Sequence, residues 1–101
     1  MYIGPTNKTP FEEVNRSVDF SALVLPNSTL SLVSVTATDS SGDDVTSAII
    51  ATSPAPSITG NVVTFRLIGG TANSWYFVST KVEDQTGQEF EGVIILTVNP
   101  Y

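Results

Sequence analysis

The side chains in this chain that could do chemistry are carboxylates and hydroxyls, because its 101 residues include neither histidine nor cysteine. Histidine is the commonest general base and transition-metal ligand, and thiolates build many structural zinc sites. A nucleophilic serine needs a base and an orienting acid beside it, so the usual triad cannot form. We therefore expect a protein that is not an enzyme and has no catalytic residues.

Two groups of carboxylates remain as candidate sites. Asp39, Asp43 and Asp44 surround Gly42, and carboxylate oxygens are ligands for Ca²⁺, which takes about six to eight. Their spacing does not match an EF-hand loop, so we expect a solvated turn with no metal. Paired carboxylates also act in glycosidases, but the second group flanks a hairpin turn rather than a cleft. It consists of Glu83, Asp84, Glu89 and Glu91. We expect these residues to protect the hairpin from aggregation, and we expect no cofactor.

Gly69-Gly70 and Tyr76 have conformational rather than chemical interpretations. No Lys or Arg follows the glycine pair and no helix is expected there, so a phosphate-binding loop is disfavoured. A tight turn that requires positive φ fits better. Tyr76 precedes Val78 by two residues, which is the spacing of a tyrosine corner with Val in place of Cys. We expect the ring in the core and the hydroxyl bonded to the preceding crossover.

Three apolar, β-branched segments must position these residues. Residues 61–68, 74–83 and 90–99 are separated by a Gly-Gly loop and a Gly-containing turn. A strand, loop, strand, hairpin and strand in this order are typical of the second half of an immunoglobulin-like sandwich. Period-two alternation predicts the inward-facing residues Val63, Phe65, Leu67, Tyr76, Val78, Thr80 and Val82.

The first half of the chain predicts shorter strands. Alternation predicts strands at residues 16–22, 30–38 and 45–51, with a small edge strand at 57–59. Val18, Phe20 and Ala22 should face inward in the first of them. In the second, Val33, Val35 and Ala37 should face inward, although Leu30 and Leu32 have the other parity. We therefore expect a bulge near Leu32.

The fold class that follows is all-β, an immunoglobulin-like antiparallel β-sandwich of about seven strands with an extended N-terminal arm. The length suits one domain of this kind. We expect residues 1–16 to form the arm, because Pro5 and Pro10 disfavour a helix there, and residues 17–101 to form the sandwich.

Apolar residues in the arm and one tryptophan are the candidate protein interface. The arm either packs back as a first edge strand or docks on a partner. Trp75 has the parity opposite to Tyr76 and is either an interface anchor or covered by the arm. The expected interface residues are Tyr2, Ile3, Phe11, Val14 and Trp75.

The last strand is apolar on both parities. Phe90, Ile94, Leu96 and Val98 share one face, while Val93 and Ile95 lie on the other. A strand of this kind is covered on both sides, either by the other sheet and the arm or by a neighbouring subunit.

Charge excludes two classes of partner. Ten acidic and four basic residues give a net charge of −6, which repels a phosphate backbone and an anionic membrane. The sequence has neither a signal peptide nor an apolar stretch long enough to span a membrane. We expect no nucleic acid or membrane partner.

Motifs spread along the chain carry a resemblance to a known family. These are K-T-P (residues 8–10), V-D-F-S-A-L (18–23), L-I-G-G-T (67–71), Y-x-V (76–78), a T-G turn (86–87) and a closing L-T-V (96–98). Their order resembles that of small tailed-phage fibre-to-tail adaptors, from Lys8 to Val98. The acidic arm and the long S-S-G-D-D turn depart from the usual pattern, which leaves the partner open.

The resemblance implies a virion protein, made in the host cytoplasm and present in several copies as a homo-oligomer. It would act as a protein-protein adaptor at the tail, fibre or neck and contact other virion proteins. One alternative is a capsid decoration protein. Another is a free-standing immunoglobulin-like binding module for a carbohydrate or a cell-surface protein, and a third is a hydrolase built on paired acids.

Overall fold

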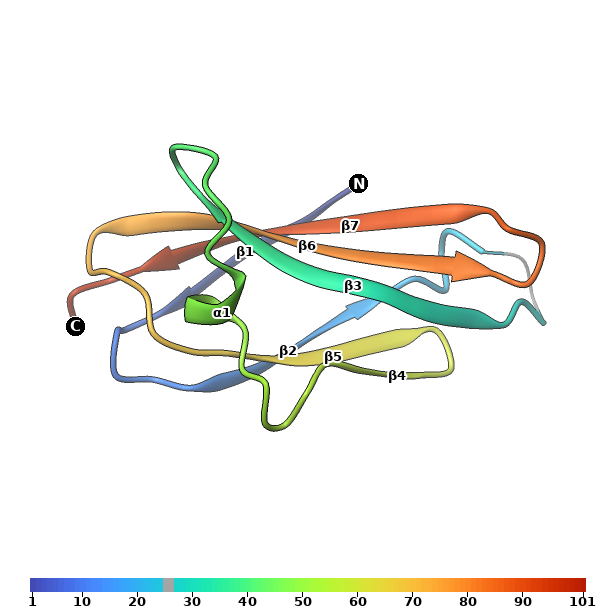
Figure 1. Ribbon diagram of the computed structural model, residues 1–101, viewed down its shortest axis with the longest axis horizontal. Coiled ribbons are helices and arrows are strands. Elements are labelled where there is room, and N and C mark those ends of the chain that lie inside the picture. Colours follow the sequence, from blue (N-terminus) through green and yellow to red (C-terminus); the bar gives the residue numbers. More distant parts are fainter. Residues whose placement is uncertain (25–26) are drawn as a thin grey trace.

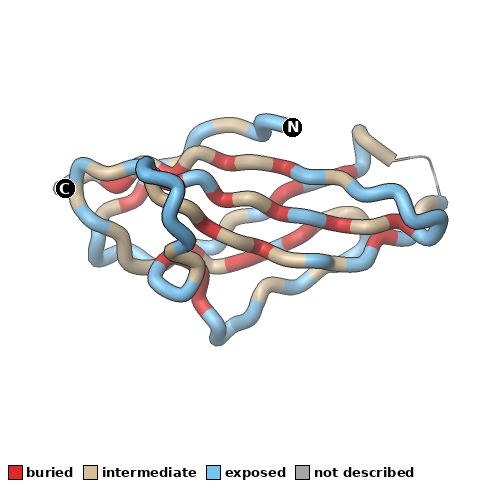
Figure 2. Tube along the Cα trace, turned by 45° about the horizontal axis from the view of Figure 1, so that its top comes forward, coloured by how far each residue is buried: buried red, intermediate tan, exposed pale blue. Residues whose placement is uncertain are grey.

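Alternating side chains build the strands of the computed structural model, which describes residues 1–24 and 27–101 (Figure 1). In β5 (Val62–Leu67) and β6 (Ser74–Asp84), every second residue is buried. The predicted inward residues of both strands, from Val63 to Val82, are confirmed as buried. Figure 2 shows the same alternation along the neighbouring strands.

The strands form two sheets. The four-stranded sheet has the order β1-β7-β6-β3, with β1 (Tyr2–Lys8), β3 (Leu30–Asp39) and β7 (Glu89–Val98) around β6. The three-stranded sheet has the order β2-β5-β4, with β2 (Val14–Asp19) and β4 (Ser57–Thr59) on either side of β5. The predicted all-β sandwich and the small strand at 57–59 are confirmed.

The strand order can be compared with that of immunoglobulin domains. There, one sheet holds strands A-B-E-D and the other holds C-F-G. Here β2-β5-β4 follows the order B-E-D, and β3-β6-β7 follows C-F-G. β1 takes a different place from strand A, because it pairs with β7.

The core lies between the two sheets and runs the length of the sandwich. Its buried apolar residues come from β2, β3, β5, β6 and β7, from Phe20, and from Ile49 and Ile50. None of them comes from β1. Burial of this apolar surface is the main stabilising term in a domain without disulfides.

The expected strand at 45–51 is wrong, because a one-turn helix, α1 (Thr46–Ile49), takes its place. Oδ1 of Asp44 accepts hydrogen bonds from the backbone N–H of Thr46 (2.9 Å) and its hydroxyl (2.6 Å). This local bonding competes with a strand and favours a turn. Ile50, which follows α1, makes an isolated bridge to Leu67, and Asp44 makes another to Thr38.

A bulge in β3 is confirmed, since the register with β6 shifts between Leu32 and Ser34. Its effect on Val33 was not anticipated. Val33 is 56% exposed, whereas Leu30, Val35 and Ala37 are buried. The extra residue turns Val33 outward and lets both parities of the sequence contribute to the core. Ala22, also expected to face inward, lies exposed in the turn after β2.

Residues 1–16 contain two strands. β1 pairs with β7 in parallel, from Tyr2 opposite Val93 to Lys8 opposite Val98. β2 begins at Val14 and pairs with β5. Of the two alternatives for the N-terminal segment, the structure has the edge strand, and its parallel pairing differs from the antiparallel sheet expected. Within the described residues, no helix has the length and apolar character needed to cross a membrane.

Candidate protein interface

The outer face of the four-stranded sheet carries a row of apolar side chains. Trp75 and Phe77 have the outward parity on β6, and Phe77 pairs with Ile95 of β7. Ile95 pairs in turn with Pro5, and Val93 with Tyr2. Residues opposite one another in a sheet point to the same face. We define these six residues as the outer apolar patch: Tyr2, Pro5, Trp75, Phe77, Val93 and Ile95.

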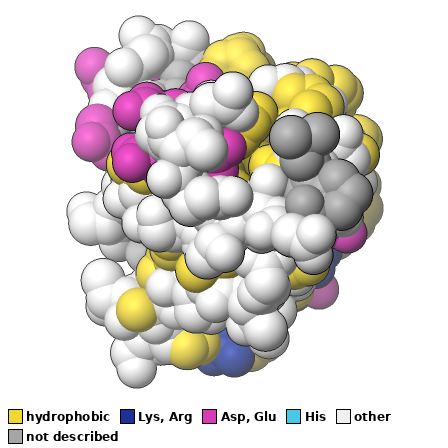
Figure 3. All heavy atoms as spheres, turned by 90° about the vertical axis from the view of Figure 1, so that its right-hand side faces the viewer, with side chains coloured by type: hydrophobic (Ala, Val, Ile, Leu, Met, Phe, Trp, Pro, Cys, Tyr) yellow, Lys and Arg dark blue, Asp and Glu magenta, His cyan; other side chains and the backbone are white. Residues whose placement is uncertain are grey.

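Aromatic side chains dominate the patch. Tyr2 is 57% exposed, Trp75 40% and Phe77 39%. The Trp75 and Phe77 rings meet edge to face, with centroids 5.0 Å apart and planes at 81°. This geometry is favourable for an aromatic pair, so the two rings hold each other in place while they remain accessible. Figure 3 views the opposite end of the molecule, where β6 turns into β7, and shows acidic side chains at its upper left and hydrophobic ones at its upper right.

The outer face of the three-stranded sheet is polar instead. Ser17, Thr64 and Ser57 form one outward row across it, and the Ser17 and Thr64 hydroxyls are 3.2 Å apart. Arg66 Nε donates to Asn15 Oδ1 (3.0 Å) beside this row. A solvated sheet face is expected to be polar, so the apolar character of the opposite face is the feature that requires explanation.

Lys8 holds β1 against the end of the sandwich. Its side chain is only 2% exposed, and its Nζ donates to the carbonyl oxygens of Thr9 (2.7 Å) and Gly69. The Lys8 carbonyl accepts from the N–H of Asn99 (2.8 Å). Burial lowers the pKa of Lys8, and the charges of Glu12, Tyr76 and Glu13 oppose this effect. The K-T-P and L-I-G-G-T motifs therefore meet through this ammonium.

The predicted tyrosine corner is confirmed beside Lys8. Tyr76 is buried, and its hydroxyl accepts a hydrogen bond from the N–H of Thr71 (2.9 Å). Gly69 and Gly70 have φ of 58° and 92°, as their predicted turn requires. A Cβ on Gly70 would lie 2.7 Å from Val98 Cγ2, so the turn packs directly on the last strand. This junction sets the start of β6, where Trp75 begins the patch.

The carboxylates of the 39–44 turn bond to their own turn. Oδ1 of Asp39 accepts from the N–H groups of Ser41 (2.9 Å) and Asp43 (3.0 Å). The Thr46 hydroxyl and N–H lower the pKa of Asp44, against a smaller opposing effect of burial. These bonds use Oδ1 of Asp39 and of Asp44 to stabilise the turn.

The hairpin carboxylates behave in the same way. Oδ1 of Asp84 accepts from the Thr86 N–H (2.9 Å), the Thr86 hydroxyl (2.7 Å) and the Gln88 N–H (2.9 Å). The Thr86 hydroxyl is the largest cause that lowers the pKa of Asp84. Glu91 accepts from the hydroxyl of Ser79. Across the described residues, no three acidic side chains cluster closely enough to hold a metal ion.

The structure separates the five predicted interface residues. Tyr2 and Trp75 share the outer apolar patch, on β1 and β6. Ile3 lies over Gly92, where an added Cβ would be 3.1 Å from its Cγ1, beside Val18. Val14 packs against the core, and Phe11, 93% exposed, lies in the turn between β1 and β2.

Phe77 is the patch residue that sequence reasoning missed. It shares the parity of Trp75, on a strand whose other parity supplies the core. The parity shared with Trp75 could have indicated from the sequence that Phe77 faces outward. It indicates an apolar surface only once the strand register places Ile95 and Pro5 beside Phe77. Val93 and Ile95 were expected to be covered; β1 borders them through Tyr2 and Pro5, yet both remain partly exposed.

Comparison with known proteins identifies the family. A family model described as podophage GP4 fiber-tail adaptor protein gp77 matches residues 8–97, from Lys8 to the penultimate residue of β7. No curated protein matches the sequence. The motifs from which a resemblance to fibre-to-tail adaptors was inferred all lie in or at the end of the matched region, so the chain belongs to the podophage GP4 fibre-tail adaptor family.

Proposed function

We propose that this protein is a non-enzymatic virion adaptor that binds tail or fibre proteins through the outer apolar patch. Family membership supports an adaptor role. The observation that carries the choice of surface is the contrast between the outer apolar patch, which covers part of the four-stranded sheet, and the polar outer face of the three-stranded sheet. Contiguous exposed apolar surface marks interaction sites in soluble proteins.

The composition of the patch suits a protein partner. Tryptophan and tyrosine are enriched among the residues that dominate binding energy at interfaces. Trp75 and Phe77 lie on a strand in the middle of the sheet rather than on a loop, so binding requires little ordering of the backbone. Several copies around the tail, as a homo-oligomer in the particle, would present this face repeatedly to the fibres.

The test is assembly of phage particles that carry a charge in the patch. Phe77→Glu adds a carboxylate among apolar side chains without entering the core, so the protein should fold but fail to join the tail. Thr64→Glu adds the same charge to the polar outer face and is the matched control. Particles would be purified, imaged by electron microscopy for fibres, and probed for the adaptor.

Three results would contradict the proposal. Phe77→Glu particles with normal fibres and normal adaptor content would show that the patch is not the interface. An adaptor found on the head rather than the tail would favour capsid decoration, one of the alternatives. A wild-type protein that is absent from wild-type particles would favour a free-standing binding module.

A further inference from the structure

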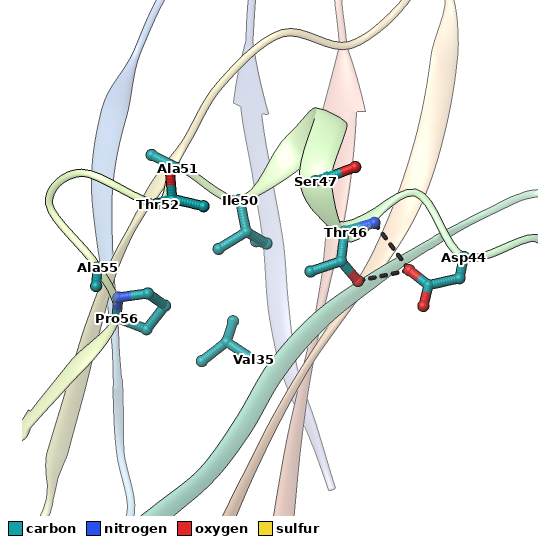
Figure 4. Close-up of a pocket in the computed structure, with 9 residues that line it drawn as sticks. All are labelled: Val35, Asp44, Thr46, Ser47, Ile50, Ala51, Thr52, Ala55 and Pro56. Carbon is teal, nitrogen blue, oxygen red and sulfur yellow. Dashed lines mark hydrogen bonds between the residues drawn. The ribbon is translucent and has the colours of Figure 1, made fainter.

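A notch lies at the open edge of the sandwich, away from the outer apolar patch. It is a pocket of about 620 Å³ between β3 and the segment from α1 to Pro56 (Figure 4). Its lining residues are Val35, Asp44, Thr46, Ser47, Ile50, Ala51, Thr52, Ala55 and Pro56. We call this feature the β3 notch. Beside it, α1 stands where the sequence predicted a strand at 45–51.

Within the described residues, Val35 is the β3 residue at the notch whose outward backbone groups have no hydrogen-bond partner. Ala37 and Asp39 face the 43–46 loop, since Ala37 O accepts from the N–H of Val45 (2.9 Å) and the N–H of Asp39 donates to Asp43 O (3.0 Å). Backbone groups of alternate residues in an antiparallel strand point the same way, so Val35 directs its N–H and C=O to this side. In the described part of the chain, β3 is an edge strand of the four-stranded sheet, with β6 as its one neighbouring strand in that sheet. Val35 is only 8% exposed, but it lines the notch, so a partner backbone would have to reach it through this opening.

The notch has an apolar wall and an anionic end. Figure 4 shows Val35, Ile50 and Pro56 around the space, with Asp44 at one end. Both bonds from Thr46 end on the same oxygen of Asp44, Oδ1, which leaves Oδ2 for a cation. The lowered pKa keeps this carboxyl ionised, and no Lys or Arg lines the notch.

The length of the site is limited. The bulge between Leu32 and Ser34 interrupts the free edge of β3 on one side of Val35, and the 43–46 loop closes it on the other. Bulges on edge strands prevent continuous pairing with a second sheet. A short extended segment fits between these two limits, whereas a long added strand does not.

We propose that the β3 notch binds a short extended segment of another virion protein, with an apolar side chain in the pocket and a lysine or arginine on Asp44. This inference rests on the proposed adaptor function in one respect: that function is the reason to expect the segment to come from another virion protein. Backbone pairing at a sheet edge with a side chain in a pocket is an established mode of peptide recognition. Charge complementarity disfavours a second copy, because this chain carries a net charge of −6. The adaptor would then hold one partner on its sheet face and another at its edge.

The test uses short overlapping peptides that cover the tail and fibre proteins of the same virion and this chain itself. Binding to the full-length protein is measured by fluorescence polarisation. Ala55 is exposed at the rim of the notch, so Ala55→Arg blocks it and repels a basic segment without altering the core. Asp44→Asn retains the acceptor for Thr46 but removes the charge, and Asp43→Asn is its control, with an equal change in net charge.

We expect a peptide that contains an apolar and a basic residue to bind the wild type. Ala55→Arg should reduce its affinity more than ten-fold, and Asp44→Asn about five-fold, while Asp43→Asn and Ala55→Ser leave it unchanged. Circular dichroism and the thermal midpoint establish that each variant is folded. In NMR spectra, a shift of the Val35 amide signal on addition of the peptide would show that the peptide binds at the notch.

Three outcomes would overturn the inference: no virion peptide binds, binding is unaffected by Ala55→Arg, or only peptides from this chain bind. The last outcome would make a second copy the occupant. Phe77→Glu separates this inference from the proposed function. If it abolishes fibre attachment while no peptide binds, the patch remains an interface and the notch does not. If peptides bind but Phe77→Glu particles are normal, the notch is a binding site and the patch is not the interface.

Discussion

Thr80 is a buried hydroxyl in the middle of the core. Its side chain is fully buried, and Oγ1 has no hydrogen-bond partner among the described residues. An unpaired buried hydroxyl costs stability, because it loses its bonds to water without replacing them. We predict that Thr80→Val, which has nearly the same shape, raises the free energy of unfolding by about 1 kcal/mol, measured by urea denaturation.

Thr80→Ser is the informative control for this prediction. It keeps the hydroxyl and removes a methyl group, so it should lower the free energy of unfolding by about 1 kcal/mol. If Thr80→Val destabilises the protein instead, the hydroxyl has a bonding role that the structure does not show.

Because of Lys8, the free energy of unfolding should depend on pH in the alkaline range. Burial lowers its pKa in the folded protein below the ordinary value of 10.5. Between those two values the unfolded chain binds a proton that the folded chain lacks, so the free energy of unfolding rises with pH. Below the folded pKa both states are charged, and the cost of burying the ammonium is constant.

We predict that Lys8→Met removes this dependence. The difference in unfolding free energy between wild type and variant should move in favour of the wild type as pH rises towards 10.5. Urea denaturation of both proteins at several alkaline pH values measures it, and other titrating groups cancel in the difference. A difference that is constant, or that moves towards the variant, would contradict a lowered pKa.

Some of these residue roles were predictable from the sequence and others were not. The tyrosine corner follows from local spacing, because Tyr76, Val78 and the crossover are neighbours in the chain. The burial of Lys8 depends on the carbonyl of Gly69, which is 61 residues away. Nothing in the local sequence distinguishes a buried lysine of this kind from an exposed one.

At the scale of elements, hydrogen bonds of short side chains decide where turns replace strands. The sequence 45–51 is apolar enough for a strand, but Asp44 and Thr46 form a bonded turn that starts α1. The same relation, an aspartate with a hydroxyl two residues later, occurs at Asp19 with Ser21 and at Asp84 with Thr86. In each, that hydroxyl is the largest cause that lowers the pKa of the aspartate.

The β6–β7 turn offers a test of this bonding. Because the pKa of Asp84 is lowered in the folded state, its contribution to stability is present above the unfolded pKa and is lost as pH falls through the folded value. Thr86→Val should raise the pKa of Asp84 towards its ordinary value and make the variant less sensitive to acid. An NMR titration of the Asp84 carboxyl measures this shift. Thr86→Ser retains the hydroxyl and should titrate like the wild type; an unchanged pKa in Thr86→Val would show that the backbone bonds suffice.

The first strand is attached to the sandwich by edge contacts. β1 supplies no residue to the apolar core, and its pairing with β7 joins segments from opposite ends of the chain. Sequence alternation could not predict this partner, because parallel pairing of distant segments leaves no local pattern. The three strands from β5 to β7 were predictable, since β5 and β6 each have one clearly apolar parity and β7 is apolar on both.

We predict that deletion of residues 1–7 lowers the free energy of unfolding by about 2 kcal/mol but leaves the β-sheet spectrum intact. The lost terms are the hydrogen bonds to β7 and the cover that Ile3 provides over Gly92. Circular dichroism and thermal unfolding measure both quantities. A truncated protein that does not fold would show that β1 is required for the sandwich. An unchanged midpoint would show that β1 adds no stability.

The two outer faces of the molecule are unlike. The three-stranded sheet presents serine, threonine and asparagine to solvent, while the four-stranded sheet presents Trp75, Phe77 and their neighbours. The sequence indicated that Val93 and Ile95 need cover, but only the strand register places them beside Pro5 and Phe77. β3 and β4 are edge strands of different sheets, and the chain between them forms α1 rather than a strand that pairs with β3 along its length.

Photo-crosslinking in assembled particles tests the central claim most directly. A photoreactive amino acid replaces Phe77 in one variant and Thr64 in another, so that the two probes report on opposite faces of the same protein. The account predicts that position 77 crosslinks to a tail or fibre protein and position 64 does not. Crosslinks from position 64 alone, or from position 77 to the major capsid protein, would contradict it.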